Sequence, residues 1–122
     1  MTAIKKKILL VDDDADFLWL TARVLEKSDY EVLQARNGEE GLSHFEKDRP
    51  DLVLMDYRMP GRDGLEIAKE MKSLLPKATI IIITGYAEIK TAVKAMRMGA
   101  YDYITKPLNE DALLFSVQRA LE

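Results

Sequence analysis

Short runs of β-branched and aliphatic residues alternate along the chain with longer stretches of helical periodicity. Five such runs recur roughly every 20 to 27 residues, at Ile8–Val11, Tyr30–Leu33, Leu52–Met55, Thr79–Ile83 and Tyr101–Ile104. Each run has the length and composition of a β-strand, and each precedes a stretch in which apolar residues follow a helical period. This alternation is typical of βα units built around a parallel sheet. The pattern therefore predicts an α/β fold of five βα units.

The five predicted strands differ in how continuously apolar they are. The first, third and fourth are almost unbroken apolar runs, whereas the second and fifth mix polar and apolar residues. A central strand of a parallel sheet is covered by helices on both faces, so it reads as a continuous apolar run. We therefore expect the second and fifth strands to lie nearer the edges of the sheet.

Residues that favour helix ends support the same division. Asp14 precedes the first helical stretch, and Asn37 and Asp63 are each followed three positions later by a glutamate, the capping-box arrangement. Gly99 stands where the fourth helix is expected to stop, and Asn109 where the fifth begins. These residues predict five helices between and after the strands.

Composition narrows the class of protein further. The 122 residues are 48% hydrophobic and 32% charged, which fits one compact domain over residues 1–122. The net charge of −3 argues against direct nucleic-acid binding, and the lack of cysteine excludes disulfides, thiolate metal sites and cysteine nucleophiles. No apolar run approaches the roughly 20 residues of a membrane span, and no signal-like segment follows Met1. A cytoplasmic location without a membrane partner is expected.

Polar residues end four of the predicted strands. Asp12, Asp13 and Asp14 follow the first, Asp56 the third, Thr84 the fourth, and a segment with Lys106 the fifth. Because the carboxyl ends of parallel strands meet at one edge of the sheet, these side chains are expected to converge there. Taken singly, each has a simpler explanation as a helix cap, a turn residue or a solvated loop residue.

Clustered carboxylates need a compensating cation. Two carboxylates about 4 Å apart repel by about 4 kcal/mol at an effective dielectric constant of about 20. Oxygen ligands of this kind suit Mg²⁺, which takes one or two carboxylates together with phosphate oxygens. A lysine and a threonine hydroxyl nearby would bind further phosphate oxygens. The sequence therefore predicts a site for phosphoryl transfer to a carboxylate.

Other acidic motifs fit these residues less well. Asp12, Asp14 and Asp16 imitate a calcium loop, but Phe17 stands where that loop needs glycine and Arg23 where it needs glutamate. The acidic segment after the first strand would also repel the phosphate of a flavin cofactor. A small aspartyl-phosphate phosphatase remains an alternative.

The motifs resemble, over essentially the whole chain, the receiver domain of two-component response regulators. The resemblance rests on Ile8–Asp14, Asp51–Gly64, Ile82–Gly85 and Lys106–Pro107, and the segment Ala95–Pro107 is most similar to the NtrC class of enhancer-binding transcription regulators. It implies the CheY-like, flavodoxin-like fold, a doubly wound five-stranded parallel sheet with strand order 2-1-3-4-5.

The resemblance also implies a phosphoacceptor and a metal site. Asp56 would take a phosphoryl group from a sensor histidine kinase. Asp12, Asp13, Asp56 and the backbone carbonyl of Arg58 would hold Mg²⁺, with Mn²⁺ as an alternative ion. Beyond its own phosphorylation and dephosphorylation, the domain would catalyse no reaction.

Phosphoryl binding and switching are assigned to the other strand ends. Lys106 and Thr84 would bind the phosphoryl group, and the peptide bond between Lys106 and Pro107 would be cis. Thr84 and Tyr103 would move together as the switch. The bulky residues Arg58 and Tyr86 are expected to slow loss of the phosphoryl group by obstructing an in-line water.

The expected readout surface is formed by the fourth helix, fifth strand and fifth helix, with the candidates Ile89, Val93, Arg97, Tyr101 and Tyr103. The NtrC-like segment predicts an output part with ATPase and DNA-binding domains in a longer protein, and a phosphorylation-dependent homodimer. A stand-alone regulator or phosphorelay protein is the alternative. His44, the sole histidine, is expected on the surface and not as a phosphodonor.

Overall fold

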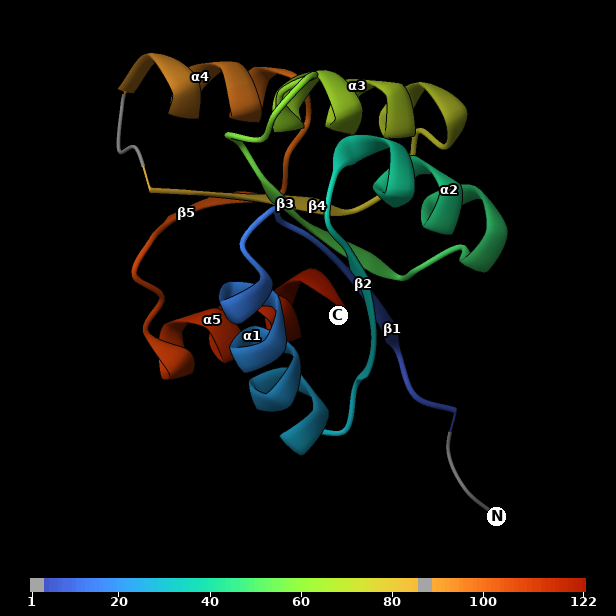
Figure 1. Cartoon of the computed structure of the whole chain (residues 1–122), viewed down its shortest axis with the longest axis vertical. Helices are drawn as coiled ribbons and strands as arrows, with labels where there is room; N and C mark the ends of the chain where they lie inside the picture. Colours follow the sequence, from blue (N-terminus) through green and yellow to red (C-terminus); the bar gives the residue numbers. More distant parts are fainter. Residues whose placement is uncertain (1–3, 86–88) are drawn as a thin grey trace.

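Strands and helices alternate in a computed structural model that describes residues 4–85 and 89–122 (Figure 1). The strands are β1 (Lys7–Val11), β2 (Glu31–Ala35), β3 (Leu52–Asp56), β4 (Ile80–Thr84) and β5 (Asp102–Thr105). The helices are α1 (Ala15–Lys27), α2 (Gly38–Asp48), α3 (Gly64–Leu74), α4 (Ile89–Arg97) and α5 (Glu110–Ala120). All strand pairs are parallel, in the order β2-β1-β3-β4-β5. The predicted fold, with its second and fifth strands at the edges, is confirmed.

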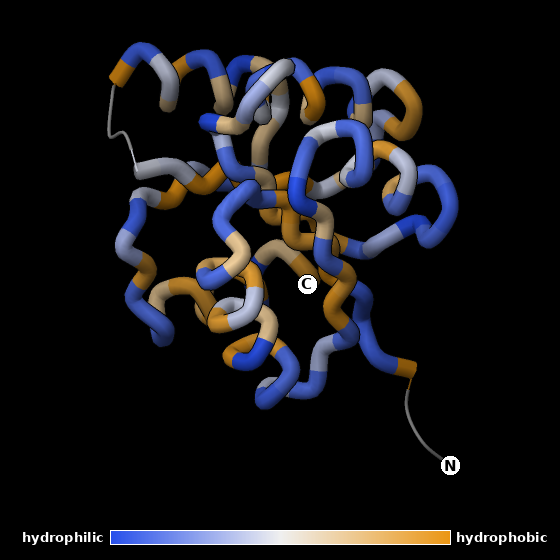
Figure 2. Tube along the Cα trace, viewed as in Figure 1, coloured by the Kyte–Doolittle hydropathy of each residue, from blue (hydrophilic) through white to orange (hydrophobic). Residues whose placement is uncertain are grey.

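Helices cover both faces of the sheet. α1 and α5 lie on one face, and α2, α3 and α4 lie on the other (Figure 1). Successive residues of a strand point to opposite faces, so Ile81 and Ile83 pack with the α1 and α5 side while Ile80 and Ile82 pack with the other. Figure 2 shows the hydrophobic segments gathered along the sheet between these layers. This burial on both sides explains the unbroken apolar runs of β1, β3 and β4.

Side-chain caps begin four of the helices where the sequence predicts them. Each cap accepts a hydrogen bond from a backbone N–H of the first turn, which otherwise lacks a partner. The distances are 2.9 Å for Asn37, Asp63 and Asn109, and 3.0 Å for the shorter bond of Asp14.

Gly99 ends α4 in the manner predicted. Its φ of 102° is open to glycine at little cost, and its backbone N–H donates to the carbonyl of Met96 at 3.1 Å. The N–H of Ala100 donates to the carbonyl of Ala95 at 3.0 Å. These two bonds form the Schellman motif, which turns the chain from α4 toward β5.

The second strand begins and ends later than predicted. The backbone N–H of Tyr30 donates to the carbonyl of Leu25 at 3.3 Å and so closes the end of α1. At the other end, the carbonyl of Ala35 accepts from Asp12 at 3.1 Å, which extends the pairing with β1. Among residues 4–85 and 89–122, no helix has the length and apolar character to cross a bilayer.

Candidate functional site

Four polar side chains meet at the carboxyl edge of the sheet. Asp12 follows β1, Asp56 and Thr84 are the last residues of β3 and β4, and Lys106 follows β5. These strands are neighbours in the sheet, so their ends lie side by side. Asp12 is 1% exposed, Asp56 5% and Thr84 0%. The structure therefore brings together the strand-end residues singled out in the sequence, and it buries three of them.

The three aspartates expected to hold a metal form one cluster. Asp12, Asp13 and Asp56 each offer a carboxylate oxygen, and these oxygens lie within 4.8 Å of one another. Asp13 is exposed while the other two are buried, so the cluster opens to solvent on one side. Hard carboxylate oxygens in a partial cage fit Mg²⁺, which keeps some of its water ligands.

Lys106 supplies the positive charge of the site. Its ammonium lies 2.7 Å from Asp12 Oδ2 and 3.8 Å from Asp56 Oδ1, while the lysine side chain is 24% exposed. The backbone N–H of Lys106 donates to the carbonyl of Thr84 at 2.7 Å, which ties the end of β5 to β4. The peptide bond between Lys106 and Pro107 is cis. Lys106 therefore spans the two buried carboxylates.

Asp56 carries a carboxyl group whose charge is disfavoured. Burial, reinforced by the negative charges of Asp12 and Asp13, raises the pKa of Asp56 from 3.8 to about 7. Lys106 and a backbone hydrogen bond from Arg58 act in the opposite direction and lower that pKa. A metal cation held by the three aspartates would relieve this repulsion, so the charge of the cluster favours the binding of a cation.

The segment after Asp56 turns sharply into α3. The backbone N–H of Gly64 donates to the carbonyl of Tyr57 at 2.8 Å. A Cβ atom at Gly64 would collide with the backbone carbonyl of Asp56, so only glycine permits this approach. The sequence indicated the neighbouring cap Asp63 but not this role of Gly64, although glycine in the first turn of a helix was a signal for it.

Thr84 and Tyr103 share one face of the sheet. The register of β4 and β5 pairs Ile82 with Tyr103 and Thr84 with Thr105, and side chains at alternate positions point the same way. Tyr103 is half-buried and packs against the core on the α2, α3 and α4 side. The two residues expected to act as the switch therefore lie one pleat apart, on the face that α4 covers.

The remaining predicted residues that the structure describes lie after β3, on α4 and just before β5. Arg58 is exposed, with its guanidinium 5.5 Å from the ring centroid of Tyr57, and Tyr86 lies outside the described residues. Ile89 is 84% exposed, Val93 40% and Tyr101 42%. Arg97 is exposed as well.

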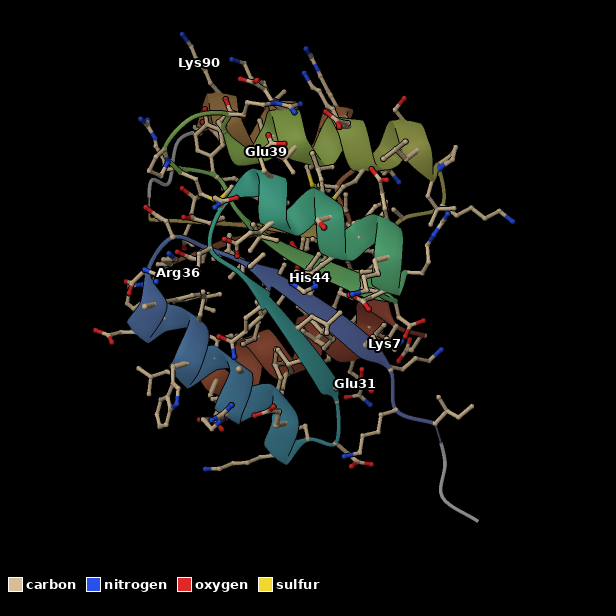
Figure 3. All side chains as sticks on the ribbon, turned by 45° about the vertical axis from the view of Figure 1, so that its right-hand side comes forward. Lys7, Glu31, Arg36, Glu39, His44 and Lys90 are labelled. Atoms are coloured by element: carbon tan, nitrogen blue, oxygen red, sulfur yellow. The ribbon has the colours of Figure 1, made fainter. Side chains whose placement is uncertain are left out.

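His44 lies on α2, away from the carboxyl edge (Figure 3). Its Nδ1 is 3.0 Å from Asp48 Oδ2.

One aromatic contact of the site was not predicted. The ring centroid of Phe17, on α1, lies 4.2 Å from the ammonium of Lys106. In the sequence Phe17 is one of several apolar residues on a helix face, and nothing there distinguishes it. Its place immediately after the aspartate run was the only available signal.

Comparison with known proteins agrees with this geometry. The sequence model of the response regulator receiver domain matches residues 8–118. Sporulation initiation phosphotransferase F of Bacillus subtilis is 37% identical over 97% of this chain and 95% of its own length. A crystal structure of a CheY-like response regulator receiver domain protein from Methanospirillum hungatei superposes with a TM-score of 0.93, at 36% identity, over 97% of this chain and 94% of that one.

A longer relative belongs to the NtrC class. Regulatory protein AtoC of Escherichia coli is 43% identical over all of this chain, which spans only 26% of the length of AtoC. The chain thus matches the receiver part of a much longer regulator as well as nearly all of a short phosphotransferase.

Proposed function

Since this chain belongs to the response regulator receiver domain family, we propose that Asp56 is its phosphoacceptor and that residues 1–122 work as one phosphorylation switch. The observation that supports this most strongly is the placement of Asp56, 5% exposed, between two further aspartates and the ammonium of Lys106. The donor is a phosphohistidine of a sensor kinase, and the reaction belongs in the cytoplasm.

Transfer needs few groups of the protein. An Asp56 carboxylate oxygen forms a bond to phosphorus while the bond from phosphorus to the donor nitrogen breaks, and the electron pair of that bond stays on the nitrogen. Lys106, 3.8 Å from Asp56, is placed to pair with a phosphoryl oxygen. Mg²⁺, held by Asp12, Asp13, Asp56 and the carbonyl of Arg58, would neutralise charge on the transferred group. Thr84 would donate its hydroxyl to that group.

Incubation with acetyl phosphate and Mg²⁺, followed by intact mass measurement, tests the acceptor. We expect wild type to gain one phosphoryl group and Asp56→Asn to gain none, because an amide cannot form the acyl phosphate. Asp111→Asn, an exposed aspartate on α5, is the matched control and should behave as wild type. An unmodified wild type, or an equal gain in Asp56→Asn, would contradict the assignment. Repeated turnover of the donor would favour the phosphatase instead.

Asp13 provides a separate test of the metal site. In chelator, Asp13→Asn should raise the free energy of unfolding by about 1 kcal/mol, since it removes one of three clustered charges at a solvent-exposed position. The same change should remove most of the stabilisation that wild type gains from Mg²⁺. Urea unfolding with and without Mg²⁺ measures both. A loss of stability in chelator would show that Asp13 acts as a hydrogen-bond acceptor.

The similarity of this chain to a regulator of the NtrC class supports a proposal for what the switch controls. Movement of Thr84 and Tyr103 on phosphorylation would alter the surface of α4, β5 and α5, where Ile89 and Tyr101 are exposed. That surface would control ATPase and DNA-binding domains of a longer protein, through a homodimer or through contact within the chain. The likeness to the short phosphotransferase supports a stand-alone relay protein as the second candidate. Arg58 and Tyr86 are proposed to slow loss of the phosphoryl group.

A further inference from the structure

The ammonium of Lys106 has a neighbour outside the acidic cluster. Besides Asp12 at 2.7 Å and Asp56 at 3.8 Å, it faces the ring of Phe17, 4.2 Å from the centroid. The face of an aromatic ring carries partial negative charge and attracts a cation at this distance. Lys106 is thus held between a carboxylate and a ring, on two different elements.

These contacts belong to a closed circuit of interactions that begins and ends at Lys106. Asp12 accepts the ammonium of Lys106 through Oδ2 and the backbone N–H of Asp14 through Oδ1, at 2.9 Å. Asp14 in turn accepts the backbone N–H of Phe17 at 3.2 Å and so fixes the first turn of α1. The aromatic ring of Phe17, on that first turn, contacts the ammonium of Lys106. The aspartate run therefore positions Lys106 twice, directly through Asp12 and indirectly through Phe17.

A lysine needs such support more than most residues. Its side chain has four rotatable bonds, and holding it in one geometry costs conformational entropy. Phe17 and Lys106 also line the same groove of about 490 Å³ between α1 and the segment that follows β5. Without the ring, the ammonium would keep its ion pair with Asp12 but lose one of the contacts that hold it out of this groove and next to Asp56.

We propose that Phe17 is a positioning residue for phosphoryl transfer, which holds the ammonium of Lys106 next to Asp56. The inference rests on the proposed function, because it gives Phe17 a role in that reaction. The aromatic face carries the effect, so an aliphatic residue of similar size does not replace it, whereas another ring does.

Three variants test this role with acetyl phosphate and Mg²⁺. Phe17→Leu should be phosphorylated about fivefold more slowly than wild type, and Phe17→Tyr at close to the wild-type rate. Leu20→Ala is the control, since Leu20 lines the same groove from α1 and is 58% exposed. Its rate should be unchanged.

A spectroscopic signature reports on the contact itself, apart from the rate of the reaction. In protein labelled at lysine, the ring current of Phe17 should shift the side-chain protons of Lys106 upfield. That shift should persist in Phe17→Tyr and vanish in Phe17→Leu, with Lys106→Arg used to assign the signal.

The inference is overturned if Phe17→Leu reacts at the wild-type rate, if Phe17→Tyr is as slow as Phe17→Leu, or if Phe17→Leu leaves the Lys106 signal in place. A wild type that takes no phosphoryl group would refute the proposed function instead, and the lysine spectrum would still report on the contact.

Discussion

Metal-free Asp56→Asn is expected to be more stable than wild type at pH 8, by about 2 kcal/mol in free energy of unfolding. In wild type the ionised Asp56 is buried beside Asp12 and Asp13, and this environment raises its pKa to about 7. At pH 8 the folded protein must therefore hold a charge that its surroundings disfavour, whereas the unfolded chain exposes the same charge to water. An amide of the same shape removes that penalty.

The dependence of stability on pH tests the same prediction independently, because the direction of the change is fixed by the raised pKa of Asp56. Between the unfolded pKa of 3.8 and the folded value of about 7, the folded state keeps a proton that the unfolded state has lost. Raising the pH through this window therefore favours unfolding, and the contribution of Asp56 to stability falls until it levels off above the folded pKa.

Urea unfolding in chelator across this pH range measures the difference between wild type and Asp56→Asn. We expect the two to be close in stability near pH 4 and to separate as the pH rises. Asp111→Asn should follow wild type throughout. A difference independent of pH would show that the substitution acts through packing and not through the charge of Asp56.

The fold was predictable from the sequence because a strand buried on both faces is an unbroken run of apolar residues. Leu52–Met55 and Thr79–Ile83 read as central strands, and both lie in the middle of the sheet. Helix starts were equally readable at Asn37 and Asp63, since a cap is a local contact between a side chain and a nearby backbone N–H. The sequence pattern predicts the start of β2 one residue too early, because Tyr30 is apolar enough for a strand although its N–H closes α1.

Only the part of the site that follows from strand topology was predictable from the sequence. Parallel strands bring Asp12, Asp56 and Lys106 to one edge whatever the details of packing. The contact of Phe17 with Lys106 depends on how α1 lies against the sheet. The approach of Gly64 to the carbonyl of Asp56 depends on the path of the loop before α3. Such distances between side chains and backbone follow from packing, which no local pattern records.

One lysine, Lys106, offsets the repulsion between the clustered aspartates. Asp12 is almost fully buried, and the ammonium of Lys106 at 2.7 Å is the cation nearest to it among the ion pairs of residues 4–85 and 89–122. A buried carboxylate that loses its partner keeps its desolvation cost and loses the compensating attraction. Removing the lysine should therefore expose the full cost of the aspartate cluster.

Lys106→Met, which keeps most of the length of the side chain and removes its charge, is expected to lower the free energy of unfolding in chelator by about 2 to 3 kcal/mol. This is below the full range for a buried pair because the lysine is 24% exposed. Saturating Mg²⁺ should recover much of the loss, since a cation held by the same carboxylates supplies the missing charge. Phosphorylation by acetyl phosphate should nevertheless slow by tenfold or more, because no other ammonium is placed beside Asp56 in the described part of the chain.

Lys69→Met is the matched control, since Lys69 is an exposed lysine on α3. It should change neither the stability nor the rate. The double variant Asp56→Asn, Lys106→Met should lose less stability relative to Asp56→Asn than Lys106→Met loses relative to wild type, because one of the two charges that the lysine compensates is already absent. Equal losses in both backgrounds would mean that Lys106 stabilises the fold independently of Asp56 and does not compensate its charge.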